Sequence, residues 1–484
     1  MARVAMILHL DGKGPLYQQL ARAIEGAILR GHLPGGARLP STRDLAVGMH
    51  LSRNTVRAAY DQLLARGALV GRRGAGSFVP DATPTPVPAA TPSAFMLTSR
   101  FARRVRENAG LSVGLLHQEL RYNLQYAEPL ADVRFVDAWR RELGLAASYT
   151  RLGYPPARGM PVLREQIAAY LRRRRGMQVT PDDILVVSGT QQALSLASRM
   201  LVDEGGMLAM EDPGYFAARA TFRANGAQVL PVPVDAEGLR VDLLPRPGPP
   251  ALYVTPAHQF PLGLCMSQRR RAELLAYARE HGCWIIEDDY DGALGLEPEP
   301  APPLFALDGG QRVIHIGTFS KGLAPSLRLA YMVLPRALGD DFAYAKRLED
   351  FGCPALSQAA LARFIETGAL ERHLRRVGRA LRTRRDALLE GLARHVEGAL
   401  RVEHHGAAMH LVAWLDERCG TTMTEFIAEA ARRDVGLHPV GPHHAEPTAV
   451  PALLLGYANL SPAEIDAACR RMGAALRHLT RRAA

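Results

Sequence analysis

The chain has 484 residues, 48% of them apolar, and a formal net charge of +11. This length and composition predict more than one buried core, and no apolar run approaches the length needed to cross a bilayer, which argues against an integral membrane protein. The first residues reach Asp11 too soon for a secretory signal, and five scattered cysteines without a CxxC pair argue against a disulfide framework or a zinc site. We therefore expect a cytoplasmic, metal-free protein of several domains.

Positive charge is concentrated at the start of the chain. Residues 1–80 hold eleven Lys and Arg against four Asp and Glu, a local net charge of +7. This asymmetry indicates either a polyanionic partner or an arginine-rich composition spread over solvated faces. The arrangement of the residues has to decide between the two.

Residues 10–80 are predicted to form three helices and a basic hairpin. The first helix follows Pro15 and ends at Gly31, and its apolar residues recur at spacings of three and four, at Leu16, Leu20, Ile24, Ala27 and Ile28. Ser41 and Ser52 are N-caps of two further helices joined by a tight turn, which together make a helix-turn-helix. The run LVGRRGAGSFV predicts two strands around a Gly-rich turn, a wing that suits phosphate contacts.

The start of the third predicted helix is rich in hydrogen-bond donors, as a recognition helix requires. This stretch resembles the winged helix of the GntR family of bacterial transcription regulators along its full length, through LPSTRDLA, LSRNTVRAAY and GAGSFV. The resemblance implies binding to a double-stranded DNA operator. The DNA-contacting residues that it implies are Arg43, Ser52, Arg53, Asn54, Thr55, Arg57, Arg73 and Gly74. The alternative is a winged helix that serves only protein contacts.

A linker follows the winged helix. From Pro80 the run PDATPTPVPAATPSA is rich in Pro, Ala and Thr, has almost no charge and no periodicity, and predicts an extended, semi-rigid spacer. We therefore divide the chain into a DNA-binding domain at 10–80, a linker at 81–114 and a second domain at 115–484.

Strand-like and helical runs alternate beyond the linker. ILVVSG, MLAMED, ALYVTP, WIIEDDY and VIHIGTF predict strands, and QQALSLASRML, FAARATFRANG and SQRRRAELLAYAREHG predict helices. This alternation predicts an α/β domain with a mostly parallel sheet covered on both faces. Ligand sites then lie at the carboxyl ends of the strands.

Residues at those strand ends fit the phosphate and the aldehyde of pyridoxal 5′-phosphate (PLP). Gly189 and Thr190 open a predicted helix, whose free N–H groups and dipole bind anions. Thr318 and Arg328 flank Lys321 in TFSKGLAPSLR and could add a hydroxyl and a guanidinium to the same phosphate. Lys321 would bond to the aldehyde as a Schiff base, because a lysine near a cationic ring and an arginine loses its proton more easily.

Other residues at the strand ends fit the ring of PLP. Asp288 in WIIEDDYD is the carboxylate that would keep a pyridine nitrogen protonated, and Tyr290, two residues on, can reach the ring's 3-oxygen. Tyr215 is the expected stacking partner, and His258 and Gln259 in TPAHQFPLG offer further polar contacts. Taken singly, these residues have ordinary interpretations, as a solvated lysine, a loop aspartate or a core tyrosine. Together, at successive strand ends, they favour a PLP site.

Residues from about 115 to 475 resemble a fold-type I aminotransferase domain, and its fusion behind a GntR winged helix resembles the MocR subfamily, through TPAHQFPLG, IIEDDYD and IGTFSKGLAPSLRLAY. The resemblance implies a PLP-binding transcription regulator whose homodimers exchange domains head to tail. It also implies that a tyrosine of the neighbouring subunit completes the phosphate cup, a place that Tyr154 in LGYPPARGMPVLR matches.

The resemblance fails where aminotransferases hold the substrate carboxylate. The segment PALLLGYANLS places Leu454 where an arginine is expected, so binding of an α-amino acid should be weak or need another cation. The spacing selects none of the candidate substitutes, which are His410, His438, His443, His444 and Arg219. The segment DGALGLE at 291–297 and the PPAR that follows Tyr154 also depart from the family pattern.

Two classes of function remain open. The first is a regulator in which PLP is itself the signal, or in which fixed PLP captures an amine or amino-acid effector as an external aldimine; either ligand must prefer one arrangement of the domains. The second is a catalytically active aminotransferase that carries a DNA-binding domain. Retained cofactor residues without the carboxylate arginine favour sensing over turnover. Cycling of the cofactor by amino acids and 2-oxo acids would discriminate between the two classes.

Overall fold

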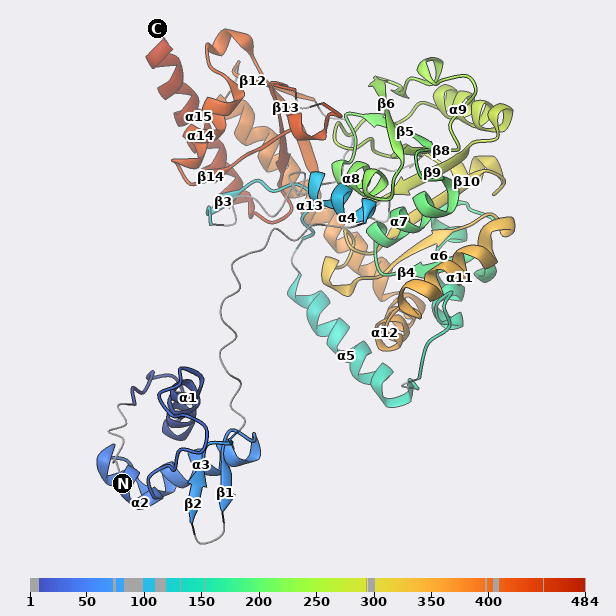
Figure 1. Ribbon diagram of the computed structural model, residues 1–484. Helices are drawn as coiled ribbons and strands as arrows, with labels where there is room; N and C mark the ends of the chain where they lie inside the picture. Colours follow the sequence, from blue (N-terminus) through green and yellow to red (C-terminus); the bar gives the residue numbers. More distant parts are fainter. Residues whose placement is uncertain are drawn as a thin grey trace. The chain divides into compact units, whose positions relative to one another are not determined.

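The computed structural model describes residues 8–72, 75–81, 99–108, 119–130, 132–151, 153–292, 294, 301–396, 398–403, 409–446 and 448–483, the side chains of 482 and 483 excepted. The chain forms two compact units, residues 1–96 and residues 97–484, each with its own core (Figure 1). Within the described part of the chain, no helix combines the length and the apolar character needed to cross a membrane.

The first unit is a winged helix, as expected. Its elements are α1 (Leu16–Leu29), α2 (Thr42–Gly48), α3 (Arg53–Ala65), β1 (Val70–Arg72) and β2 (Gly76–Phe78). The side chains of Ser41 and Ser52 accept hydrogen bonds from the N–H groups of Asp44 and Thr55, so both predicted N-caps are present. β1 and β2 pair antiparallel to form the wing. The three helices share one apolar core, which includes Leu20, Ile24, Leu45, Val56 and Leu63.

The second unit is built around an eight-stranded sheet. Its strands, in spatial order, are β4 (Ile184–Val187), β11 (Ala330–Val333), β10 (Val313–Thr318), β9 (Trp284–Asp289), β8 (Ala251–Val254), β5 (Met207–Asp212), β6 (Gln228–Asp235) and β7 (Gly238–Leu239). β11 and β7 run antiparallel to their neighbours and the other strands are parallel. The prediction of a mostly parallel sheet is therefore confirmed, with β11 inserted between β4 and β10.

Alternate residues of each strand enter two different cores, because successive side chains of a strand point to opposite faces. Leu185 and Val187 of β4 pack in one core and Ile184 and Val186 in the other. The helices that pack in the first core are α7 (Thr190–Leu201), α8 (Phe216–Ala224) and α11 (Gly339–Asp350). Those that pack in the second include α6 (Pro161–Arg175), α9 (Gln268–His281), α10 (Leu304–Asp308) and α12 (Ala355–Glu366). The sheet is thus covered on both faces, as predicted.

A smaller antiparallel sheet completes the second unit. It consists of β12 (Leu400–Glu403), β13 (His410–Leu415), β16 (Ala452–Gly456) and β15 (His438–Pro439). A separate parallel pair is formed by β3 (Tyr122–Asn123) and β14 (Val435–Gly436). The helices of this part are α13 (Ala369–Val396), α14 (Met423–Ala431) and α15 (Pro462–Ala483), and α15 packs against both α13 and α14. The remaining long helix is α5 (Val133–Tyr149), which packs on α12.

One helix lies inside the range 81–114 that the sequence assigns to the linker. This is α4 (Arg100–Glu107), which packs on α8 and belongs to the second unit. The neighbouring segments 82–98 and 109–118 lie outside the described residues.

Candidate functional site

A cavity of about 340 Å³ lies at the carboxyl ends of the parallel strands of the large sheet. It receives side chains from the ends of β9 and β10 and from the segments that follow β4, β5 and β8, where a parallel sheet collects its ligand-binding residues. Seven of the predicted cofactor residues line it together: Thr190, Tyr215, Asp288, Tyr290, Thr318, Lys321 and Arg328.

One part of the cavity is suited to an anion. Gly189 caps α7 with a φ of 128°, and a Cβ atom at this position would lie 2.7 Å from Nη2 of Arg328. Only glycine therefore lets the Arg328 guanidinium lie beside the N-terminus of α7. Arg328 itself has a φ of 50°, a left-handed conformation that costs a non-glycine residue roughly 1 kcal/mol. A guanidinium beside a helix N-terminus is an arrangement that binds phosphate.

The carboxylate at the end of β9 is buried and only half satisfied. Asp288 Oδ2 accepts a hydrogen bond from the Tyr253 hydroxyl at 2.9 Å, whereas Oδ1 has no partner among the described residues. Burial raises the pKa of Asp288 to about 7. The buried hydroxyl oxygen of Tyr290 also lacks a partner within the described chain, and burial raises its pKa.

These two unpaired atoms allow a test of whether PLP fits the cavity. A buried polar atom without a partner costs about 1–3 kcal/mol, so Asp288 and Tyr290 indicate a ligand with polar groups placed for both. PLP carries a ring nitrogen that can donate to a carboxylate and, beside the aldehyde, an oxygen that can pair with a hydroxyl. The residues present therefore fit this cofactor.

Lys321 is half-buried, and its Nζ donates to the carbonyl of Ala127 at 2.7 Å. Ala127 has a φ of 61°, a left-handed conformation that non-glycine residues adopt mostly where the surrounding structure forces them. Burial lowers the pKa of Lys321, although the carboxylates of Glu128, Asp288 and Asp291 oppose this effect. A lowered pKa enlarges the fraction of neutral amine, which is the form that attacks a carbonyl.

Besides Gly189, three predicted cofactor residues lie outside the cavity lining. Nδ1 of the half-buried His258 is 2.8 Å from Asp291 Oδ1, and the buried Gln259 donates to the Pro213 carbonyl at 2.7 Å, so both residues shape the loops around the cavity. Tyr154 is 88% exposed, and its ring packs 5.5 Å from that of Phe351. Its expected role in the cup of a neighbouring subunit stays a prediction.

The place expected for a carboxylate-binding arginine is apolar. Leu454 is fully buried on β16, in a cluster that includes Tyr126, Phe260, Val412, Val440 and Ala452. Arg219, a candidate substitute, is also buried and outside the lining, with Nη1 and Nη2 donating to the carbonyls of His443 and Pro442 at 2.9 and 3.0 Å. Its guanidinium therefore holds a loop of the smaller sheet.

The four candidate histidines do not place a cation in the cavity either. His410 lines it, but Nε2 donates to the Pro261 carbonyl at 2.8 Å and burial lowers the pKa, so the ring is neutral near pH 7. His443 is outside the lining, and burial lowers its pKa to about 3. His438 and His444 also lie outside the lining.

Several residues of the cavity were not predicted, and most of them carry no signal in the sequence. Tyr253, whose hydroxyl holds Asp288, belongs to β8, where the sequence shows only a strand. Tyr126 and Glu128 flank Ala127, which is 194 residues from its partner Lys321. Ser320, which sequence reasoning also omitted, could have been found from its position next to Lys321.

The winged helix presents most of the predicted DNA-contacting residues. Arg43, Arg53, Asn54 and Arg57 are exposed near the N-terminal ends of α2 and α3. The hydroxyls of Ser52 and Thr55 lie 2.8 Å apart, so these two side chains are occupied in capping α3. Arg73 and Gly74 lie outside the described residues.

Comparison with known proteins finds two families in one chain. The model of the family described as bacterial regulatory proteins, gntR family, matches residues 16–79, and that of aminotransferase class I and II matches residues 123–472. The chain is 35% identical to the probable rhizopine catabolism regulatory protein MocR of Rhizobium meliloti, over 94% of this chain and 93% of the relative. It is 32% identical to the HTH-type pyridoxine biosynthesis transcriptional regulator PdxR of Corynebacterium glutamicum, over 82% and 83%.

A solved structure extends the similarity of the second unit. The crystal structure of LysN, an alpha-aminoadipate aminotransferase from Thermus thermophilus, is similar with a TM-score of 0.68 and 29% sequence identity. The match covers 77% of this chain and 97% of that chain, which was complexed with N-(5′-phosphopyridoxyl)-L-leucine.

Proposed function

This chain belongs to the MocR subfamily of GntR-type transcription regulators, and we propose that it binds PLP in the cavity at the strand ends and that the contents of this cavity set its affinity for operator DNA. The observation that supports this most directly is a convergence in one place. Lys321, the half-satisfied carboxylate of Asp288 and the pair formed by Arg328 and the N-terminus of α7 all meet at this cavity.

Different residues of the cavity would contact different groups of the cofactor. Arg328, the first N–H groups of α7 and Thr318 would hold the phosphate, and Asp288, itself fixed by Tyr253, would accept a hydrogen bond from the protonated ring nitrogen. The carbonyl of Ala127, which accepts a hydrogen bond from Nζ of Lys321, would position the Lys321 amine in the cavity. PLP, when bound, supplies an aldehyde that reacts with primary amines.

The names of the relatives support two kinds of signal. PdxR is named for pyridoxine biosynthesis and MocR for rhizopine catabolism. In the first kind, PLP itself is sensed; in the second, bound PLP recognises an amine. In both cases the ligand must bind one arrangement of the domains more tightly than another, since only a difference in affinity shifts an equilibrium.

The test combines absorption with DNA binding. The purified PLP-free chain is titrated with PLP and then with primary amines, while the visible spectrum and the affinity for a duplex selected from a random-sequence pool are followed together. A visible band on PLP addition with a change in DNA affinity supports PLP as the signal; a change only after an amine supports the amine. No visible band, or DNA affinity that never changes, would contradict the proposal.

We expect the site to prefer amines without a carboxylate. Among the described lining residues the cations are Lys321 and Arg328, which the cofactor would engage, and the carboxylates are Glu128 and Asp288. An unpaired carboxylate is costly to bury, so isopentylamine should bind the PLP-loaded chain at least about tenfold more tightly than leucine, the same amine with an α-carboxylate. Spectral titration gives both Kd values, corrected for the neutral fraction of each amine. Leucinamide, whose carboxyl group is uncharged, is the control and should behave like isopentylamine; leucine binding as tightly as either would contradict the expectation.

Arg53 provides a test of the DNA-binding surface. It is exposed at the first position of α3, where a recognition helix reads base edges. Arg53→Ala should weaken binding to the selected duplex by about 1–3 kcal/mol and should leave binding to unrelated duplexes nearly unchanged. Arg30→Ala, which removes the same charge at the C-terminal end of α1, is the control. An equal loss on all duplexes would assign Arg53 to a phosphate instead.

A catalytically active aminotransferase is the second candidate, and the similarity to LysN is the observation that favours it. Turnover requires a group that binds the carboxylates of an amino acid and a 2-oxo acid. The described lining residues include no cation for this purpose apart from Lys321 and Arg328. We therefore expect that leucine and 2-oxoglutarate together do not cycle the visible band of the PLP-loaded chain.

A further inference from the structure

Helix α4, the first described element of the second unit, is poorly suited to stand alone. It has eight residues, no buried side chain, and four arginines at Arg100, Arg103, Arg104 and Arg106. Arginines three or four positions apart lie on neighbouring turns and repel one another. Isolated helices of this length are marginal in water. The helical form of α4 therefore depends on the surface on which it docks.

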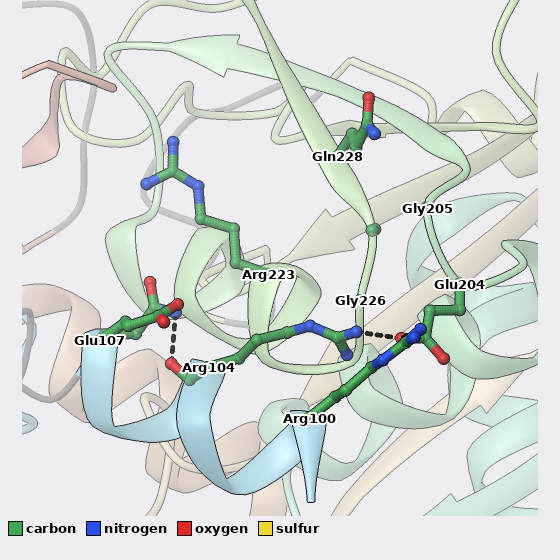
Figure 2. Close-up of a pocket in the computed structure, with 10 residues that line it drawn as sticks. Arg100, Arg104, Glu107, Glu204, Gly205, Arg223, Gly226 and Gln228 are labelled. Carbon is green, nitrogen blue, oxygen red and sulfur yellow. Dashed lines mark hydrogen bonds and ion pairs between the residues drawn. The ribbon is translucent and has the colours of Figure 1, made fainter.

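That surface is made by Glu204 and the end of α8. Glu204 pairs with both Arg104 and Arg100, the latter at 3.3 Å, and Figure 2 shows the two guanidinium groups converging on its carboxylate. Nη1 of Arg104 also lies 3.5 Å from the Ala224 carbonyl. Gly226 has a φ of 102°, and a Cβ there would lie 2.8 Å from the same nitrogen, so glycine makes room for the guanidinium. The two arginines lower the pKa of Glu204, which keeps it charged.

Two helices connect the cofactor cavity to this surface. α7 begins at Thr190, which lines the cavity, and ends at Leu201, three residues before Glu204. α8 begins at Phe216, which also lines the cavity, and ends at Ala224, whose carbonyl contacts α4. With 12 and 9 residues, they span roughly 18 and 13 Å at the helical rise. Each helix thus has one end at the cavity and the other at or near the docking surface.

Side chains join α7 and α8 along their length. Gln191, which lines the cavity, accepts a hydrogen bond from Thr221 of α8 at 3.0 Å. At the other end, Asn225 donates to the Ser198 hydroxyl of α7 at 2.7 Å. Phe222 is fully buried in the core that both helices share. Because packed elements shift between discrete arrangements and resist continuous deformation, the two helices should move as one body.

We propose that α7 and α8 transmit the occupancy of the cofactor cavity to α4, and that the contact of Arg100 and Arg104 with Glu204 couples the cavity to the winged helix. The inference rests on the proposed function, in which the cavity sets DNA affinity. In chain order the segment 82–98 connects the winged helix to α4, so the docked or released state of α4 sets where the chain from the winged helix joins the second unit. Exposed ion pairs add little to stability, so the contact can be removed without unfolding the unit.

Charge reversal at Glu204 is the direct test. Glu204→Arg places a fifth arginine against α4 and should release it. The full-length chain is titrated with the selected duplex, with and without saturating PLP, and with isopentylamine added if this enlarges the wild-type effect. For wild type we expect the two Kd values to differ by about fivefold or more, a common size for coupling between sites. For E204R the ratio should fall below about twofold, while the Kd for PLP without DNA changes by less than about twofold.

Trypsin reports the state of α4 separately. After Arg73 the next basic residues in the chain are Arg100, Arg103, Arg104 and Arg106, so cleavage in α4 yields a distinct pair of fragments. Cleavage there should be faster in E204R than in wild type. In the double variant R104E/E204R, which restores opposite charges, both the slow cleavage and the coupling should return.

The matched control is Glu273→Arg on α9, where Glu273 pairs with Arg269 at 2.8 Å and is similarly exposed. It makes the same change in net charge and should keep the wild-type ratio. Coupling retained in E204R, or lost equally in E273R, would overturn this inference and leave the proposed function standing. A wild-type ratio of one under every condition would overturn both.

Discussion

Asp288→Asn protein should bind PLP roughly a hundredfold or more weakly than wild type, while its PLP-free form should be more stable at pH 8. The carboxylate is buried at the cavity, with Oδ1 unpartnered among the described residues. Loss of one partner from a buried charged pair costs about 3–5 kcal/mol. In the asparagine variant the protonated ring of PLP loses its charged partner, so this cost weakens the binding of PLP. Asparagine keeps an oxygen for the Tyr253 hydroxyl, so the PLP-free fold loses no hydrogen bond.

The gain in stability has a defined pH dependence. Burial raises the pKa of Asp288 from 3.8 to about 7, so between these values the folded chain keeps a proton that the unfolded chain has lost. The contribution of Asp288 to wild-type stability therefore falls as pH rises through this window and is constant above it. The asparagine variant lacks this fall. Its advantage should grow from near zero below about pH 4 to a plateau above about pH 7, of at most about 4 kcal/mol.

Urea unfolding of the PLP-free chain between pH 5 and about pH 8 measures this advantage. The three tryptophans, Trp139, Trp284 and Trp414, all lie in the second unit, so their fluorescence follows that unit alone. Glu211→Gln is the matched control, because burial also raises the pKa of Glu211 to about 7 although it does not line the cavity. It should gain stability over the same window and keep its affinity for PLP. Unchanged PLP affinity in D288N would contradict the assignment of Asp288.

Lys321→Ala should abolish the visible absorption band that PLP acquires on binding, and should leave DNA binding in the absence of PLP intact. The reason is that Lys321 supplies the amine among the described lining residues, and burial lowers its pKa toward the range in which it reacts. The winged helix has a core of its own, so the loss of one cavity side chain should not disturb it.

The composition of the chain makes this test sharp. There are three lysines, Lys13, Lys321 and Lys346, and Lys346 is fully buried with its Nζ 2.7 Å from Asp350 Oδ1. Borohydride treatment of the PLP-loaded chain followed by peptide mapping should therefore mark Lys321. Lys13→Ala is the control and should keep the full band. A band that persists in K321A, or a mark on Lys13 in wild type, would place the reactive amine elsewhere.

Much of the fold could be predicted because its signals are local. Ser41 and Ser52 cap their helices through contacts that span three residues, and the alternation of β4 residues between two cores follows from the pleat of a strand. Helix α4 was not predicted, because its arginines are stabilised by Glu204, a residue 100 positions away from Arg104. Repulsion along its own sequence argues against a helix there.

The meeting of the predicted cofactor residues in one cavity could be expected for a related reason, whereas other residues of the cavity could not be predicted. Parallel strands end at one edge of a sheet, so polar residues that follow successive strands can be expected to meet, as seven of them do. Tyr253 lies within an apolar strand and Glu128 lies outside the strands, so this rule selected neither of them. They reach the cavity from the end of a buried strand and from a turn far away in the chain.

The sequence by itself determined the order of the domains and the type of each fold, and it predicted a set of residues for binding PLP, since these depend on periodicity, capping and strand order. Only the tertiary structure decided the charge and availability of those groups. The Arg219 guanidinium donates to carbonyls that lie 223 and 224 residues away in the chain, and His410 is neutral because burial lowers its pKa. Asp288 keeps one oxygen that has no partner among the described residues. Burial and long-range hydrogen bonds set protonation and pairing, and neither is encoded in the spacing of residues along the chain.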